Sequence, residues 1–89
     1  MCLNDYRDEV KEFLVKVNSL GKNQEQKLVW LEKELVLLKS AVMDSDYKAI
    51  SHQIYDMMYL LFEIAADNNS DLDSEWINGG NKKDKYVKG

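Results

Sequence analysis

Residues 46–67 read D-Y-K-A-I-S-H-Q-I-Y-D-M-M-Y-L-L-F-E-I-A-A-D, and this stretch decides the fold. At helical spacing its apolar side chains cover well over half of the circumference. What remains is a narrow polar stripe, which consists of His52, Gln53, Asp56, Glu63 and Asp67. The stretch therefore predicts one long helix with a narrow polar face.

The rest of the chain is also compatible with helix. It contains no proline, and Leu, Lys, Glu, Met and Ala dominate its middle part. Apolar periodicity and end signals predict further helices over about residues 4–20, 23–42 and 72–78, and Gly79 and Gly80 should end the last one. We expect a single all-α domain over residues 1–89, with three main helices, a short fourth helix and a basic tail over 79–89.

The helix over residues 23–42 is apolar on nearly all sides. Its main stripe consists of Leu28, Leu31, Leu35, Leu38 and Val42. Trp30, Leu37 and Ala41 widen this stripe, and Val29 and Val36 lie on the opposite face. A helix of this kind is buried by more than one neighbour, which in a chain of 89 residues favours self-association into a helical bundle. The predicted core or oligomer interface consists of Trp30, Leu31, Leu35, Leu38, Tyr55, Tyr59 and Phe62.

Composition excludes several classes of function. The formal net charge is −4, which argues against a general nucleic-acid binder. No apolar run approaches the roughly 20 residues of a membrane span, and the polar, acidic N-terminus is unlike a secretory signal. One cysteine and one histidine can form neither an intramolecular disulfide nor a Cys/His zinc site. These features predict a cytoplasmic protein.

Glu34 is the first candidate for chemistry. At 100° per residue it projects into the apolar wedge of its helix, between Trp30 and Leu31. A lone carboxylate there costs several kcal/mol unless a charged group meets it. Glu34 is therefore a metal ligand or ion-pair partner in a helical core. The alternatives are that it lies at the wedge edge, or that it pairs with Lys27 or Lys33 at the surface.

The polar stripe of residues 46–67 offers a second candidate. His52 and Asp56 are i, i+4 neighbours, and Glu63 follows two turns later on the same side. Carboxylates on one face bind hard divalent cations through oxygen. The alternative is a solvated face on an otherwise buried helix.

The C-terminal segment offers a third candidate. Asn81, Lys82, Lys83 and Lys85 form a basic group in an otherwise acidic protein. Trp76 before the group and Tyr86 after it suggest a docked segment, which would make a plausible phosphate grip. The alternative is a disordered, solubilising end.

The run from Asp56 to Trp76, D-M-M-Y-L-L-F-E-I-A-A-D-N-N-S-D-L-D-S-E-W, resembles the MazG-like all-α nucleotide pyrophosphohydrolases, which include the dimeric dUTPases and the phosphoribosyl-ATP pyrophosphohydrolases. The residues that carry the resemblance follow in the family order: Asp56, Tyr59, Asp71, Trp76, Asn81 and the lysines at 82, 83 and 85. The resemblance covers roughly residues 24–86. It implies a homodimer or a tetramer, Mg²⁺-dependent release of pyrophosphate from a nucleotide, and a tail that folds back to contact the substrate phosphates.

The chain departs from the family at the metal site. The family pattern is Glu-Glu-x-x-Glu on one helix and Glu-x-x-Asp on the next, whereas here at most Glu34 and Asp56 remain and Gln53 replaces one acid. Two carboxylates and a triphosphate can bind one Mg²⁺ but are poorly suited to orient two. Three hypotheses follow: a degenerate member that binds a nucleoside phosphate or a protein partner, an active Mg²⁺-dependent pyrophosphohydrolase, and a small helical interaction module without a nucleotide role.

Overall fold

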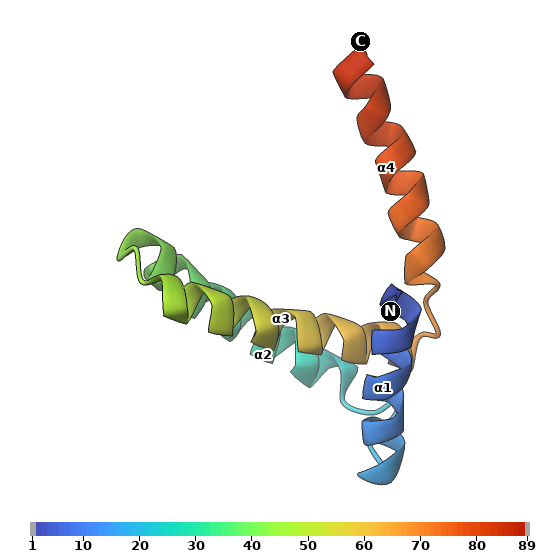
Figure 1. Ribbon diagram of the computed structural model, residues 1–89. Helices are drawn as coiled ribbons and strands as arrows, with labels where there is room; N and C mark the ends of the chain where they lie inside the picture. Colours follow the sequence, from blue (N-terminus) through green and yellow to red (C-terminus); the bar gives the residue numbers. More distant parts are fainter. Residues whose placement is uncertain (1, 89) are drawn as a thin grey trace.

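The computed structural model describes residues 2–88, and every regular element among them is a helix (Figure 1). The four helices are α1 (Leu3–Lys16), α2 (Gln24–Met43), α3 (Tyr47–Asp67) and α4 (Leu72–Lys88). The predicted all-α fold is confirmed. The bounds of α2 and α3 lie within one residue of those predicted from the apolar periodicity.

Helices α2 and α3 form an antiparallel hairpin, and α1 crosses it near its open end (Figure 1). The side chain of Asp46 caps α3, since it accepts a hydrogen bond from the backbone N–H of Ala49 at 3.1 Å. A small core lies where α1 meets α3. It consists of Val10, Leu14 and Ala66, with Leu20, Tyr59 and Phe62 packed against it.

Helix α1 ends at Lys16, four residues before the end that the apolar pattern predicted. Asn18 adopts the left-handed conformation (φ 54°), and the N–H of Ser19 turns back to the carbonyl of Leu14 at 2.8 Å. This turn satisfies a free carbonyl at the helix end. It also brings Leu20 onto the core instead of onto a further helical turn.

The start of α4 is tied to the start of α1 by side-chain hydrogen bonds. Asn4 accepts from the N–H of Leu72 at 2.9 Å and donates to Asp71 at 3.0 Å. Arg7 donates to the carbonyl of Ser70 at 2.6 Å, and Asp73 accepts from the N–H of Leu3 at 2.9 Å. Asp71 also accepts from the N–H of Ser74. The hydrogen bonds that Asp71 accepts from Asn4 and Ser74 lower its pKa to about 2.

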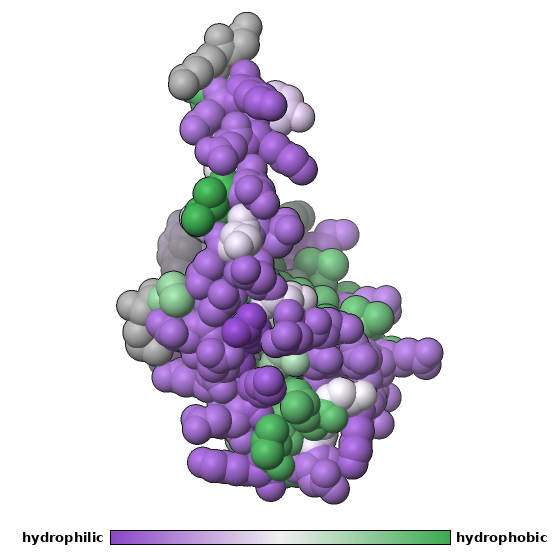
Figure 2. All heavy atoms as spheres, turned by 90° about the vertical axis from the view of Figure 1, so that its right-hand side faces the viewer, coloured by the Kyte–Doolittle hydropathy of each residue, from purple (hydrophilic) through white to green (hydrophobic). Residues whose placement is uncertain are grey.

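Helix α4 continues through Gly79 and Gly80, so the prediction that these glycines end the helix and begin a tail was wrong. Each glycine costs a helix about 1 kcal/mol relative to alanine, which weakens a helix without forbidding it. Asp73 and Glu75 at its start and the lysines in its second half interact favourably with the helix dipole and so stabilise the helix. Figures 1 and 2 show α4 as a projecting rod with a mainly hydrophilic surface.

Much apolar surface is left uncovered within one chain. Leu31 and Leu38 are half-buried against α3, but Leu28, Leu35 and Val42 from the same predicted stripe are exposed. Trp30, Tyr55 and Trp76 are exposed as well. Within residues 2–88, no helix has the length and apolar character needed to cross a membrane.

Candidate functional site

Glu34 and Asp56 line the same open pocket, on one side of the α2–α3 hairpin. Its volume is about 430 Å³, and Trp30, Tyr55, Tyr59 and Leu60 complete its lining. The two carboxylates come from facing helices and are 22 positions apart in sequence. The structure thus brings together the two predicted metal ligands.

Glu34 carries a buried oxygen atom without a partner. Its Oε2 is enclosed and has no hydrogen bond in the described part of the chain. No ion pair joins Glu34 to Lys27 or Lys33 there, so the alternative that Glu34 pairs with one of these lysines was wrong. Lys27 is held instead by Asp67 on α3. An enclosed carboxylate oxygen without a donor in the chain takes its partner from outside it, as a cation, a water molecule or a donor of a ligand.

Asp56 is half-buried and contacts His52, with Nε2 and Oδ2 3.2 Å apart. Because His52 lies one helical turn away and is 68% exposed, this contact leaves the imidazole free to move into solvent. Asp56 can then turn its carboxylate to a ligand in the pocket.

Gln53, on the same face of α3, also has a buried oxygen without a partner, Oε1. Gln53 does not line the pocket of Glu34 and Asp56. Its position in the polar stripe was visible in the sequence, but its unsatisfied oxygen was not. An amide oxygen can accept a hydrogen bond or bind a cation without carrying charge.

The polar stripe of α3 faces α2, so the alternative that it is a solvated face was wrong for most of its members. The side chain of Asp67 is fully buried, and Gln53, Asp56 and Glu63 are half-buried. Glu63 is not brought beside Glu34 and Asp56. It lies near Lys27 and Asp67, and burial raises its pKa while the charge of Lys27 opposes the rise.

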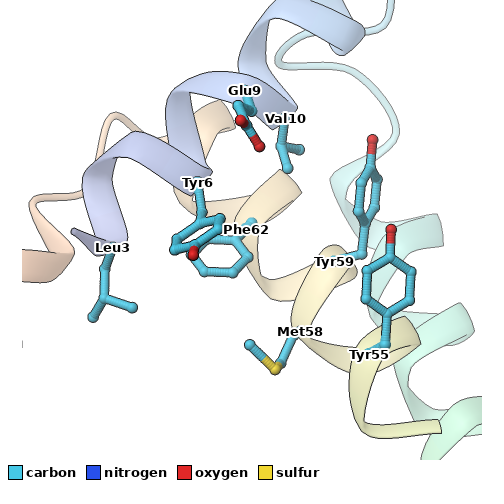
Figure 3. Close-up of a pocket in the computed structure, with 8 residues that line it drawn as sticks. All are labelled: Leu3, Tyr6, Glu9, Val10, Tyr55, Met58, Tyr59 and Phe62. Carbon is cyan, nitrogen blue, oxygen red and sulfur yellow. The ribbon is translucent and has the colours of Figure 1, made fainter. Parts of the chain in front are cut away.

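A second, more apolar pocket shares Tyr55 and Tyr59 with the pocket of Glu34 and Asp56 (Figure 3). It has a volume of about 440 Å³, and α1 supplies Tyr6 and Glu9 to its wall. The rings of Tyr6 and Phe62 pack with centroids 6.0 Å apart. Sequence reasoning missed this pocket because it depends on how α1 crosses α3.

The residues fit one hard cation better than two. No group of three or more His, Cys, Asp or Glu side chains that could hold a metal ion is found among residues 2–88. Glu34 and Asp56 provide two carboxylates, one with an unpartnered oxygen. Mg²⁺ is often bound by one or two carboxylates, with phosphate oxygens and water as the other ligands.

The predicted phosphate-binding residues lie elsewhere. Asn81, Lys82, Lys83 and Lys85 are exposed on α4, which packs at its start against α1 and then projects from the body (Figure 1). The expected return of this segment over the helix ends is not observed. Within one chain, the basic group and the carboxylate pocket are therefore separate.

The sequence matches no family model and no curated protein, and the structure matches no solved structure. The resemblance to MazG-like pyrophosphohydrolases accordingly stays a prediction.

Proposed function

We propose that the protein binds a nucleoside phosphate in the pocket of Glu34 and Asp56, through one divalent cation, without hydrolysing it. The observation that supports this function best is the unpartnered, buried Oε2 of Glu34, whose side chain lines one pocket together with Asp56. A cation would give this oxygen a partner and would attract phosphate to the same place.

The charge of the pocket favours a cation as the first ligand. Two carboxylates repel a free phosphate, so a phosphate ester can approach them only with a metal ion between the charges. One Mg²⁺ with two carboxylate ligands retains coordination positions for phosphate oxygens and water. The protein would thus provide two carboxylate ligands to the cation, and the phosphate oxygens of the nucleotide and water would provide the others.

The aromatic lining suits a nucleobase. Trp30 and Tyr55 line the pocket and are 45% and 61% exposed. Stacking of a base on an aromatic side chain is worth about 1–3 kcal/mol in single-stranded nucleic-acid complexes. A ligand with both a flat ring and a phosphate would use both halves of the pocket.

Binding without hydrolysis is the form of the proposal that the residues favour. Hydrolysis of a phosphoanhydride by two metal ions requires both the attacking and the leaving oxygen to be held. Trp30 and Leu31, or Lys33 and Leu37, occupy positions at which the resembled family has acids. Glu34 and Asp56 are too few to hold two ions.

The test is a nucleotide panel measured by calorimetry, with Mg²⁺, with Mn²⁺ and with EDTA, alongside an assay for released pyrophosphate. We expect metal-dependent binding without pyrophosphate. Glu34→Gln and Asp56→Asn should each weaken binding at least about tenfold, which corresponds to about 1.4 kcal/mol. Glu12→Gln, which neutralises an exposed carboxylate on α1, is the matched control and should bind as the unaltered chain does.

Two outcomes would overturn the proposal. Metal-dependent pyrophosphate release that is lost in Asp56→Asn would show an enzyme with a non-standard metal site. Absence of binding under every condition would favour the protein-interaction module, for which the exposed apolar side chains of α2 are the supporting observation.

A further inference from the structure

Helix α2 carries a second apolar face that nothing in the chain covers. Three adjacent pairs recur every seven residues, and all six side chains are exposed: Leu28 and Val29, Leu35 and Val36, Val42 and Met43. Glu32 and Lys39 lie between successive pairs on the same face. We call these eight residues the α2 seam.

The α2 seam is distinct from the face that packs on α3. Lys27 and Ala41 are buried, and Leu31, Glu34 and Leu38 are half-buried, which identifies the α3-facing side. At 100° per residue the centre of the seam lies about a third of a turn from this side. A seven-residue apolar repeat is the spacing by which two helices pack along each other.

The order of residues in the seam is symmetric in a way that matters for pairing. Glu32 and Lys39 are equally distant from the midpoint between Leu35 and Val36. The same holds for Val29 and Val42, and for Leu28 and Met43. If a second α2 runs antiparallel about this midpoint, apolar residues face apolar residues and each glutamate faces a lysine.

We propose that two copies of the chain pair antiparallel along α2, about a two-fold axis between Leu35 and Val36. Glu32 of each copy then lies opposite Lys39 of the other, twice per dimer, as an isologous interface requires. A parallel pairing in the same register would place Glu32 against Glu32 and Lys39 against Lys39. The charges therefore select the antiparallel arrangement as well as the partner.

The opposite charges at Glu32 and Lys39 are the argument for a second copy over another protein. An unrelated partner would need its own complementary charge pattern, whereas this seam contains its own complement. Each copy also offers six exposed apolar side chains along a helix of 20 residues, which is about 30 Å long.

The pairing does not depend on the proposed nucleotide site. Trp30 and Glu34 lie on the opposite flank and on the α3-facing side of α2, so a partner on the seam leaves their pocket open. A failure of either proposal is therefore distinguishable from a failure of the other.

The experiment measures the mass in solution by sedimentation, as a function of concentration. We expect a dimer for the unaltered chain. Glu32→Lys and Lys39→Glu should each weaken the dimer at least about tenfold, because each places two like-charged pairs across the axis. The double variant Glu32→Lys/Lys39→Glu should restore the dimer, which loss of fold or general charge effects cannot explain.

Mixing provides a second, sharper readout. The two single variants, each weak alone, should form a heterodimer with each other, because lysines of one chain then face glutamates of the other. Lys33→Glu on α2 and Glu12→Lys on α1 change the same charges at exposed positions off the seam. Both should dimerise as the unaltered chain does.

The orientation is tested by cross-linking in a Cys2→Ser background. Leu28 and Val42 lie on the same edge of the seam, so oxidation of a mixture of Leu28→Cys and Val42→Cys chains should give a mixed disulfide dimer only in the antiparallel arrangement. An unaltered chain that stays monomeric, or a dimer that persists unchanged in both charge variants, would overturn the proposal. A mixture that yields no mixed disulfide would overturn the antiparallel register.

Discussion

Lys27 is a fully buried charged side chain in a small protein with few buried residues. Its Nζ lies 2.6 Å from Oδ2 of Asp67, and both side chains are almost inaccessible to solvent. The other oxygen of Asp67 accepts the N–H of Gly21 at 2.7 Å. This pair ties the start of α2 and the preceding loop to the end of α3, because neither charge tolerates burial without the other.

We expect Lys27→Met to lower the free energy of unfolding by about 3–5 kcal/mol, since it leaves the carboxylate of Asp67 buried without a counter-charge. Adding Asp67→Asn should recover much of this loss, because asparagine can still accept the N–H of Gly21 without carrying charge. Urea denaturation followed by circular dichroism measures both values. A double variant no more stable than Lys27→Met would contradict this reasoning.

Glu63, unlike the Lys27–Asp67 ion pair, should destabilise the folded protein at neutral pH. Burial raises its pKa above the ordinary value of 4.5, so the folded state disfavours the ionised form. The folded protein therefore gains stability from this group as the pH falls through the raised pKa. Glu63→Gln should stabilise the protein at pH 7 and lose this advantage near pH 4. Loss of stability at pH 7 would mean that attraction to Lys27 outweighs burial.

Single residues were predictable where the helical pattern itself was anomalous. Glu34 interrupts an apolar wedge and Asp56 belongs to a narrow polar stripe, so both could be singled out, and the structure brings them to one pocket. The Lys27–Asp67 pair could not be found in this way. Its partners are 40 positions apart, and the pairing depends on the register of the hairpin.

Helix α4 is the element whose stability is easiest to test. We expect the double substitution Gly79→Ala/Gly80→Ala to strengthen it by up to about 2 kcal/mol, because alanine is favoured over glycine in a helix by about 1 kcal/mol. An added Cβ at either position meets nothing within 4 Å in the chain. Amide hydrogen exchange within α4 should slow while exchange in α2 and α3 stays unchanged.

Gly79 and Gly80 could instead be required for contact with another molecule, and the same double variant tests this. If the double alanine variant lowers the stability of the protein or its tendency to associate, the glycines serve a close approach by another molecule. Asn78→Ala is the control, since it improves helix propensity one position earlier and leaves both glycines in place.

At the scale of elements, long apolar patterns were reliable and end signals were less so. The bounds of α2 and α3 followed from periodicity, because their apolar residues continue to the last turn. The end of α1 did not, since the left-handed conformation of Asn18 ends the helix before Gly21. The prediction that Gly79 and Gly80 end a helix failed because neither glycine takes the positive φ that a helix-ending glycine adopts.

The whole molecule is more extended than a compact domain of its length. Its radius of gyration is 15.3 Å, whereas about 12 Å is typical for a compact chain of this size. Buried hydrophobic residues are limited to Val10, Leu14, Ala41, Ala65 and Ala66 among residues 2–88. Such a small core gives little stabilisation, and extensive apolar surface on α2 and α3 remains available to a second copy.

The stability of the protein should accordingly depend on its concentration. If folding and pairing along the α2 seam are linked, the melting temperature rises with protein concentration, because a partner that binds only the folded state stabilises it by mass action. We expect this slope for the unaltered chain and for Lys33→Glu, and a flat dependence for Lys39→Glu. Differential scanning calorimetry over a hundredfold range of concentration measures it. Equal slopes in all three proteins would place the stabilising contact on another surface of the molecule.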